Sequence, residues 1–256
     1  MSNLPKGFRG AAIAAGLKSS GALDLTLIVN DGPRFDAAAV YTTNKVVAAP
    51  VIWSREVTKG GLVRAAVLNS GGANACTGPQ GFADTHQTAE KVGELLSISS
   101  GEVVVCSTGL IGEPLPMPII ISGLESIATA LKLESLDDVS RAIMTTDSVP
   151  KVAASSINGV DFAGVAKGAG MLAPALATML SVVMTDAVLP GDAQEIFARV
   201  ADRTFNRIDS DGCTSTNDTV LLMGSGASGV ALVESDLEAA LMEICGSLAS
   251  QLIADA

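Results

Sequence analysis

The sequence is poor in aromatic residues, in charge and in long apolar runs, and these shortages exclude several classes of protein. Only 17% of the 256 residues are charged, whereas 48% are hydrophobic and the mean hydropathy is +0.43. A chain this apolar buries a core and does not stay disordered. The longest apolar runs, Met117–Ile121 and Met179–Met184, fall far short of the roughly 20 residues that a membrane span needs. The N-terminal segment lacks the apolar core of a secretion signal, so we expect a cytoplasmic protein outside the membrane.

Histidine and paired cysteines are also scarce. The one histidine, His86, falls in a predicted amphipathic helix, where a surface or packing role is expected. A structural zinc site therefore lacks ligands, and no metal is expected. A Ser-His-Asp hydrolase would need a Gly-x-Ser-x-Gly motif to meet His86, and the sequence has none. The four cysteines show no Cys-x-x-Cys spacing and are predicted to be reduced, buried thiols: Cys76, Cys106, Cys213 and Cys245.

The net charge of −11 is unevenly distributed along the chain. Residues 178–256 hold 12 acidic residues and three arginines, a balance of −9, whereas residues 1–177 hold 15 acidic and 13 basic residues, a balance of −2. Nucleic acid is not an expected partner, because binding to phosphates needs a basic surface. The acidic C-terminal part is interpreted as the solvated faces of two helices.

Short β-rich runs alternate with helical patterns, which predicts an α/β fold built of packed layers. The predicted strands are Leu25–Asn30, Ala65–Asn69, Glu102–Cys106, Leu180–Met184 and Val220–Met223. The predicted helices are Phe82–Leu96, Pro118–Leu131, Leu136–Met144, Asp192–Phe205 and Asp236–Ala254. A capping box of Ser235 and Glu238 is expected to start the last helix. The string Gly224–Gly229 fits the dinucleotide-binding pattern Gly-x-Gly-x-x-Gly. That role requires a helix to begin at the third glycine, whereas the last helix is expected to begin near Ser235, so a turn is predicted.

Two glycine-rich loops follow predicted strands. The loop Asn69–Gly78, NSGGANACTG, either forms a nest of backbone N–H groups that holds an anion or makes a tight turn. In the loop Ser107–Gly112, STGLIG, a threonine hydroxyl beside a glycine N–H could stabilise a developing oxyanion. The alternative for this second loop is a plain strand-to-helix connection.

The segment Lys167–Asp186 contains the most unusual pattern, a glycine turn that leads through Pro174 to Ala177 and Thr178 and then at once into an apolar β-run. If the bond before Thr178 broke, a threonine with a free α-amine would stand at the start of a buried strand. Such an amine can act as the base for its own hydroxyl, which needs no histidine. The hydroxyl could also attack the preceding carbonyl and cause the cleavage itself. The alternative is an ordinary loop that enters a core strand.

Taken together, several blocks resemble the ornithine acetyltransferase (glutamate N-acetyltransferase) family of arginine biosynthesis, in the order of that family and along essentially the whole chain. The blocks are GFRGAAIAAGLKSSGALDL, VLNSGGANACTG, CSTGLIGEPLP, AIMTTDSVPK, KGAGMLAPALATML and DSDGCTSTNDTV. The resemblance implies a cytoplasmic, autocleaving enzyme with an α/β/β/α sandwich of the N-terminal-nucleophile-like type. It also implies cleavage between Ala177 and Thr178 into an alpha chain, residues 1–177, and a beta chain that begins with residues 178–256. These chains are expected to assemble as an α2β2 heterotetramer.

The family's roles carry over to matching residues. Thr178 is implied as the nucleophile of self-cleavage and of acetyl transfer, Thr108 and Gly109 as the oxyanion-stabilising pair, and Thr145 and Lys167, with Thr178, as substrate-binding residues. The implied reaction moves the acetyl group from N2-acetyl-L-ornithine to L-glutamate through an acetyl-threonine. No cofactor is implied. Acetyl-CoA enters only as an alternative acetyl donor that some members accept.

The sequence departs from the family pattern at its C-terminal end. The helical pattern runs to Ala256 without a stop signal, one residue before an active-site glutamate of the family, and the family's C-terminal segment is absent. We therefore expect a truncated chain, whose own activity is open. Two alternatives remain: a self-cleaving aminopeptidase or amidohydrolase of the same architecture, in which water accepts the acyl group, and an inactive fragment that folds only with a partner chain.

Overall fold

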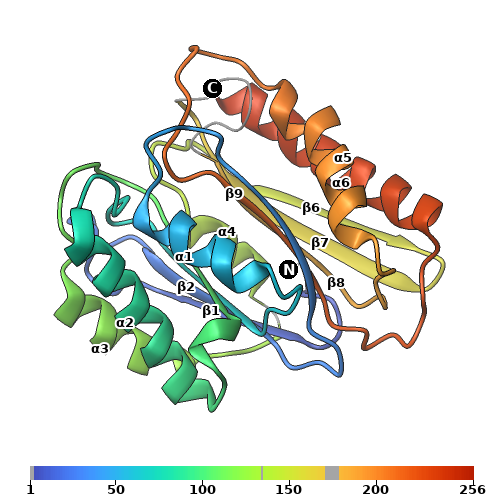
Figure 1. The fold of residues 1–256 in the computed structure, drawn as a ribbon, viewed down its shortest axis with the longest axis horizontal. Coiled ribbons are helices and arrows are strands. Elements are labelled where there is room, and N and C mark those ends of the chain that lie inside the picture. Colours follow the sequence, from blue (N-terminus) through green and yellow to red (C-terminus); the bar gives the residue numbers. More distant parts are fainter. Residues whose placement is uncertain (1–2, 134, 171–178) are drawn as a thin grey trace.

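The computed structural model describes residues 3–133, 135–170 and 179–256, and it consists of two stacked β-sheets between helices (Figure 1). The four-stranded sheet has the order β1-β2-β4-β5, with β1 at Phe8–Ile13, β2 at Leu25–Asn30, β4 at Ala65–Asn69 and β5 at Val103–Ser107. The five-stranded sheet has the order β3-β9-β8-β7-β6. Its strands are β3 Asp36–Tyr41, β6 Lys151–Ile157, β7 Val160–Lys167, β8 Leu180–Thr185 and β9 Thr219–Gly224.

Helices cover the outer faces of both sheets. The helices are α1 Ala49–Thr58, α2 Gly78–Leu96, α3 Met117–Ala128, α4 Leu136–Ala142, α5 Ala193–Arg203 and α6 Glu234–Asp255, with 3-10 turns at Ser100–Glu102 and Phe205–Arg207. An apolar core joins α2 and α3 to the four-stranded sheet, and another joins α5 and α6 to the five-stranded sheet. A third core lies between the sheets and includes residues of α1 and α4. The predicted α/β/β/α sandwich is confirmed.

Strand direction determines where loops gather. β4 and β5 run parallel, with Asn69 opposite Ser107, so the loops that follow them leave the sheet at the same edge. In the other sheet β7 pairs antiparallel with β8, and Lys167 at the end of β7 is opposite Leu180 at the start of β8. Chain segments 1–177 and 178–256 share this sheet, because β8 and β9 lie between β7 and β3. The predicted alpha and beta chains would therefore share one sheet.

Several elements differ from the sequence prediction. Strands β1, β3, β6 and β7 and helix α1 were not predicted, because their alanine, glycine and serine residues give weak β patterns and α1 is short. The capping box at Ser235 and Glu238 is wrong. Helix α6 begins at Glu234 without a side-chain cap, and Glu238 instead forms ion pairs with Arg199 and Arg203 of α5, at 2.8 and 3.3 Å. The string Gly224–Gly229 forms a turn, as predicted.

Helix α6 is long and apolar enough to cross a membrane if judged by length and composition alone. In the fold it packs along β6 and β7 with its apolar side buried. The buried residues recur every three or four positions: Leu237, Leu241, Ile244, Leu248 and Leu252. This spacing is that of a core helix with one apolar stripe.

The exposure of His86 and of the four cysteines tests two further predictions. The His86 side chain on α2 is 46% exposed and packs on the Trp53 ring, with ring centroids 5.0 Å apart, which confirms a surface and packing role. All four cysteines are free thiols. The prediction that they are buried is right for Cys106 and Cys245 but wrong for Cys76 and Cys213, which are exposed, because both lie in loops and not in the core.

Gly164 on β7 allows α6 to pack closely on the sheet. A Cβ atom at this position would lie 2.9 Å from Leu248 Cδ1 and 3.1 Å from Ile244 Cγ2. We predict that Gly164→Val lowers the free energy of unfolding by about 1–3 kcal/mol, measured by urea denaturation. Gly246→Ala, in α6 where the added Cβ meets nothing within 4 Å, is the control and should stabilise by about 0.5–1 kcal/mol. Equal effects of both variants would contradict the close packing.

Candidate functional site

Four of the predicted site residues line one cavity of about 700 Å³. Thr108 and Gly109 follow β5, Thr145 follows α4, and Lys167 ends β7. The cavity therefore lies where the two sheets meet the segment after α4. The other lining residues are Leu17, Lys18, Ser19, Ser20, Ser70, Gly71, Leu110, Thr146 and Gly170. Residues far apart in the chain are thus brought together in the grouping that the resemblance implied.

Ala177 and Thr178, the predicted cleavage pair, lie outside the described residues. Met179, the residue after Thr178, is described, and β8 begins one residue later. The Met179 N–H donates a hydrogen bond to Asp218 Oδ1 at 2.9 Å. The roles predicted for Ala177 and Thr178 therefore stay predictions.

Thr108 is buried, yet its hydroxyl oxygen has no hydrogen-bond partner within the described part of the chain. Its backbone N–H donates to the Asn69 carbonyl at 3.0 Å, which fixes the start of the loop to the neighbouring strand. A buried hydroxyl without a partner costs free energy, and a ligand oxygen could relieve that cost. Thr108 lines the cavity, so its unpartnered hydroxyl is a candidate donor to a ligand bound there.

Position 109 has no room for a side chain. Its φ is +133°, and a Cβ atom there would lie 2.8 Å from the Gly72 nitrogen. The loops after β4 and β5 are in contact at this point, and hydrogen bonds between Ala73 and Leu110 and between Ala75 and Gly112, each 2.9 Å, join them. Glycine therefore lets the two loops approach each other.

The loop Asn69–Gly78 also approaches the N-terminal part of the chain. A Cβ atom on Gly71 would lie 2.3 Å from Leu17 Cβ, so a larger residue would displace the loop that carries Leu17 and Lys18. Asn217, just before β9, donates to the carbonyls of Ala73 and Ser107 at 2.6 and 2.9 Å and holds both glycine-rich loops to the other sheet. This close packing favours the tight-turn interpretation, whereas an anion nest remains a hypothesis.

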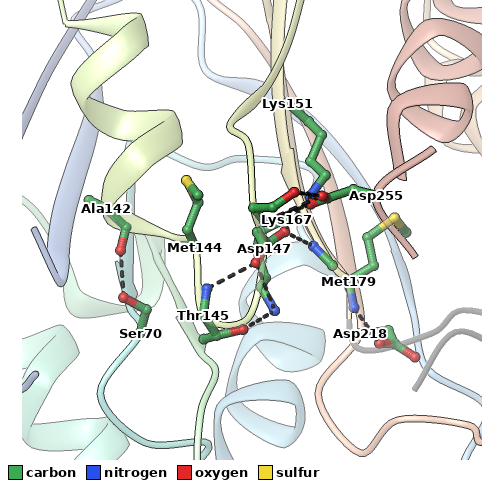
Figure 2. A network of polar contacts seen from close by, with 12 residues as sticks. Ser70, Ala142, Met144, Thr145, Asp147, Lys151, Lys167, Met179, Asp218 and Asp255 are labelled. Atoms are coloured by element: carbon green, nitrogen blue, oxygen red, sulfur yellow. Dashed lines mark hydrogen bonds and ion pairs between the residues drawn. The ribbon is translucent and has the colours of Figure 1, made fainter. Parts of the chain in front are cut away.

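Lys167 is buried and is held from two sides (Figure 2). Its Nζ donates to Thr145 Oγ1 at 2.8 Å and lies 3.8 Å from Asp147 Oδ2. Burial lowers the pKa of Lys167, although the charge of Asp147 opposes that effect. Thr145 and Lys167, two of the three predicted substrate-binding residues, are therefore in direct contact with each other.

Asp147 is the residue that organises this pair, and the sequence analysis assigned it no role. Its carboxylate accepts the Thr145 N–H at 2.9 Å and the Gly168 N–H at 2.5 Å. It also accepts a hydrogen bond from Lys151 Nζ at 2.7 Å. Burial opposes ionisation of Asp147, but the charge of Lys167 and these hydrogen bonds outweigh it and lower the pKa of the carboxyl. The carboxylate thus stays charged between two lysines.

Lys151 extends the ion-pair network to the C-terminal end of α6. Its side chain is fully buried and pairs with both Asp147 and Asp255 (Figure 2). Asp255 also accepts the backbone N–H of Ser148 at 3.0 Å. These contacts fix the last turn of α6 beside the segment that carries Thr145.

Asp218 is a second acidic residue that sequence analysis did not single out. It precedes β9, is fully buried, and accepts the Met179 N–H with one oxygen, while the other lacks a partner among the described residues. Burial raises its pKa to about 7, although the hydrogen bond from Met179 and the charge of Lys167 oppose the increase. Asp218 is therefore a carboxyl that titrates near neutral pH beside the start of β8.

This titration predicts a pH dependence of stability. The pKa of Asp218 is raised on folding from its ordinary value of 3.8 to about 7. Its contribution is therefore fully present below about pH 4 and is lost as the pH rises towards 7 and the buried carboxyl ionises. Asp218→Asn keeps the oxygen that accepts the Met179 N–H and removes the titration. We predict that the variant gains stability relative to the wild type between pH 5 and pH 8, measured by urea denaturation.

The control for the loss of one charge is Asp202→Asn, an exposed position on α5. If the difference in unfolding free energy between wild type and Asp218→Asn were independent of pH, the assigned titration would be wrong.

The described residues contain no group of three or more histidine, cysteine, aspartate or glutamate side chains that could hold a metal ion. The residues that line the cavity offer hydroxyl groups, backbone amides and lysine charges. This set suits the binding and acyl transfer of a small, negatively charged ligand.

Comparisons with known proteins match the chain to one family. The model of the ArgJ family matches residues 9–256. The chain is 54% identical over 252 residues to the arginine biosynthesis bifunctional protein ArgJ of Streptomyces avermitilis, covering 98% of this chain and 66% of the relative. It is 52% identical over 261 residues to the protein of the same name from Mycobacterium tuberculosis, covering 98% and 65%. The chain thus spans slightly less than two thirds of the length of these relatives.

Solved structures agree. The ornithine acetyltransferase of Mycobacterium tuberculosis, in complex with ornithine, has 47% identity and a TM-score of 0.59 over 66% of this chain and 92% of that chain. The ArgJ structure from Bacillus halodurans has 37% identity and a TM-score of 0.61, over 70% and 94%. A Burkholderia β-aminopeptidase, 14% identical with a TM-score of 0.59 over 100% of this chain and 88% of that chain, shares the fold alone. The family model, both curated relatives and the solved structures show that the chain belongs to the ArgJ family.

Proposed function

We propose that this protein transfers the acetyl group of N2-acetyl-L-ornithine to L-glutamate in the cytoplasm, after self-cleavage between Ala177 and Thr178. The observation that carries the proposal is the cavity that joins Thr108 and Gly109 to Thr145 and Lys167, beside the strand that starts after Thr178. Membership in the ArgJ family and the likeness to an ornithine acetyltransferase support it. Because the chain spans 66% of its relatives' length, the activity, substrates and partners of the whole protein are part of this proposal.

In the first half-reaction, the free α-amine of Thr178 accepts the proton of its own hydroxyl, and the oxygen attacks the acetyl carbonyl of the donor. The resulting oxyanion is stabilised by the Thr108 hydroxyl and the Gly109 N–H. The carbon–nitrogen bond then breaks, and the ornithine amine leaves with the proton. The acetyl group is now an ester on Thr178.

In the second half-reaction, the α-amine of glutamate attacks the same ester carbonyl, and the same pair stabilises the oxyanion. The bond to the Thr178 oxygen breaks, that oxygen takes a proton, and N-acetylglutamate is released. Lys167 and Thr145 bind the amino-acid part of each substrate, with the Lys167 ammonium facing a carboxylate. Splitting the transfer into two steps lets one nucleophile serve both substrates.

Self-cleavage uses the same nucleophile. The Thr178 hydroxyl attacks the carbonyl carbon of Ala177, the peptide bond to the Thr178 nitrogen breaks, and water hydrolyses the ester to leave a carboxylate on Ala177. The interleaved sheet supports an assembly that survives this cut, because β8 and β9 each pair with strands from the part before Thr178. We propose an α2β2 heterotetramer as the final assembly.

The nucleophile is tested by the mass of the purified chain. Because self-cleavage requires the Thr178 hydroxyl, we predict two fragments that meet at Ala177 and Thr178 in the wild type and one uncut chain in Thr178→Ala, measured by intact mass spectrometry. Under native conditions the two wild-type fragments should co-elute. Finding Thr178→Ala cut at the same bond would point to an external protease and contradict self-cleavage.

The oxyanion role of Thr108 is tested by separating activity from stability. Loss of one oxyanion donor typically lowers the rate by about 10²–10³-fold, so Thr108→Ala should lose this much acetyl transfer from acetylornithine to glutamate. Since the hydroxyl has no partner among the described residues, its removal breaks no hydrogen bond there, so Thr108→Ala should unfold with the same free energy as Thr108→Ser, which lacks the same methyl group.

Thr108→Ser keeps the hydroxyl and serves as the control, with activity close to the wild type. An equal loss in both variants would show that Thr108 matters through packing instead.

Assays without glutamate detect transfer of the acetyl group to water, which distinguishes a hydrolase from a transferase.

A further inference from the structure

The charge of the cavity contrasts with the charge of the whole protein. The net charge is −11, yet the described residues that line the cavity include two lysines, Lys18 and Lys167, and no acidic residue. Lys167 lies within 3.8 Å of Asp147, which offsets part of its charge. No carboxylate oxygen lies within 4.0 Å of Lys18 Nζ among the residues that the structure describes. The proposed function uses Lys167 and leaves Lys18 without a role.

Lys18 is held at the cavity by neutral groups. Its Nζ donates to the carbonyl oxygens of Met144 at 2.7 Å and Leu23 at 2.9 Å. An ammonium group has three N–H donors, so one donor and the whole positive charge are available for a ligand. The side chain is half-buried, and burial lowers its pKa while Asp24 and Asp147 oppose that effect.

The two lysines flank consecutive residues. Lys18 contacts the Met144 carbonyl, whereas Lys167 contacts the Thr145 hydroxyl. Met144 and Thr145 lie side by side in the close-up of the polar network (Figure 2). Both ammonium groups therefore reach the same short segment at the cavity wall, from the N-terminal loop and from β7.

The loop that carries Lys18 is rigidly organised. The buried carboxylate of Asp24 accepts four successive backbone N–H groups, at distances of 2.6 to 3.1 Å: those of Ala15, Gly16, Leu17 and Lys18. The Leu17 side chain also packs against Gly71 of the loop after β4. A charge on a preorganised loop loses little conformational entropy when it binds a ligand.

We propose that Lys18 binds the side-chain carboxylate of a dicarboxylic acceptor amino acid, while Lys167 faces its α-carboxylate. This inference rests on the proposed function and names the residue that selects glutamate in the second half-reaction. Two separated cations match a ligand with two carboxylates. Ornithine and N2-acetyl-L-ornithine both end in a side-chain ammonium, so the attraction to Lys18 distinguishes glutamate from both.

The test compares glutamate with glutamine, which has nearly the same shape and no side-chain charge. Binding of each amino acid to the purified chain is measured by calorimetry in the wild type and in Lys18→Gln, which keeps an N–H donor and loses the charge. A charge-assisted hydrogen bond predicts that the variant binds glutamate about 10- to 100-fold more weakly and binds glutamine as the wild type does. Lys18→Arg restores the charge and should recover much of the preference for glutamate.

Lys59→Gln is the matched control, because Lys59 is exposed directly after α1 and pairs only with Glu56 among the described residues. It should bind both amino acids as the wild type does. The proposal is overturned if Lys18→Gln weakens both amino acids equally, since that result means a structural role for the loop. It is also overturned if the wild type does not prefer glutamate to glutamine.

Acetylation of Thr178 by acetylornithine is followed separately by mass spectrometry. Absence of acetylation in the wild type would contradict the proposed function, whereas the glutamate-to-glutamine binding ratio decides the role of Lys18 in either case.

Discussion

The buried carboxylate of Asp147 is the interaction on which the candidate site depends. It lies between Lys151 and Lys167 and accepts two backbone N–H groups, so it connects the segment after α4, the start of β6 and the end of β7. Charges taken out of water are tolerated only when they are paired and hydrogen-bonded. Without this carboxylate, two buried ammonium groups would face each other, and neither Thr145 nor Lys167 would keep its position.

The layered fold explains why this network lies beside the Thr108 loop. The parallel strands β4 and β5 end at one edge of the four-stranded sheet, and their loops reach across to the five-stranded sheet. Asn217, two residues before β9, binds both loops, while β7 ends with Lys167 in the same sheet as β9. Each sheet thus contributes one half of the cavity. Glycines at positions 71 and 109 permit the close contacts that complete it.

Much of the fold could be predicted from the sequence because its central strands are nearly continuous apolar runs. LTLIVN, AAVLN and TVLLMG are buried on both faces, which is the pattern of strands between packed layers. The outer strand β6, KVAASSI, has little β propensity and is held by its pairing with β7 and its packing under α6. Such tertiary support does not appear in a local pattern.

The site was predictable in its members but not in its organisation. Thr108, Gly109, Thr145 and Lys167 were identified by resemblance to the family, since nothing in their spacing shows that they share a cavity. In the sequence Lys151 has the pattern of an ordinary polar residue, and its partner Asp255 is 104 residues away. Asp218 lies in a quoted block, but its burial and its contact with Met179 follow only from the pairing of β8 with β9.

We propose that Thr178 carries the acetyl group between two substrates. It is tested most directly by incubating the protein with acetylornithine alone and analysing the peptide that begins at Thr178 by mass spectrometry. We predict that this peptide gains one acetyl group, attached to the Thr178 hydroxyl, and that added glutamate removes it as N-acetylglutamate. Acetyl transfer to glutamate without any acetylation of Thr178 would contradict the account.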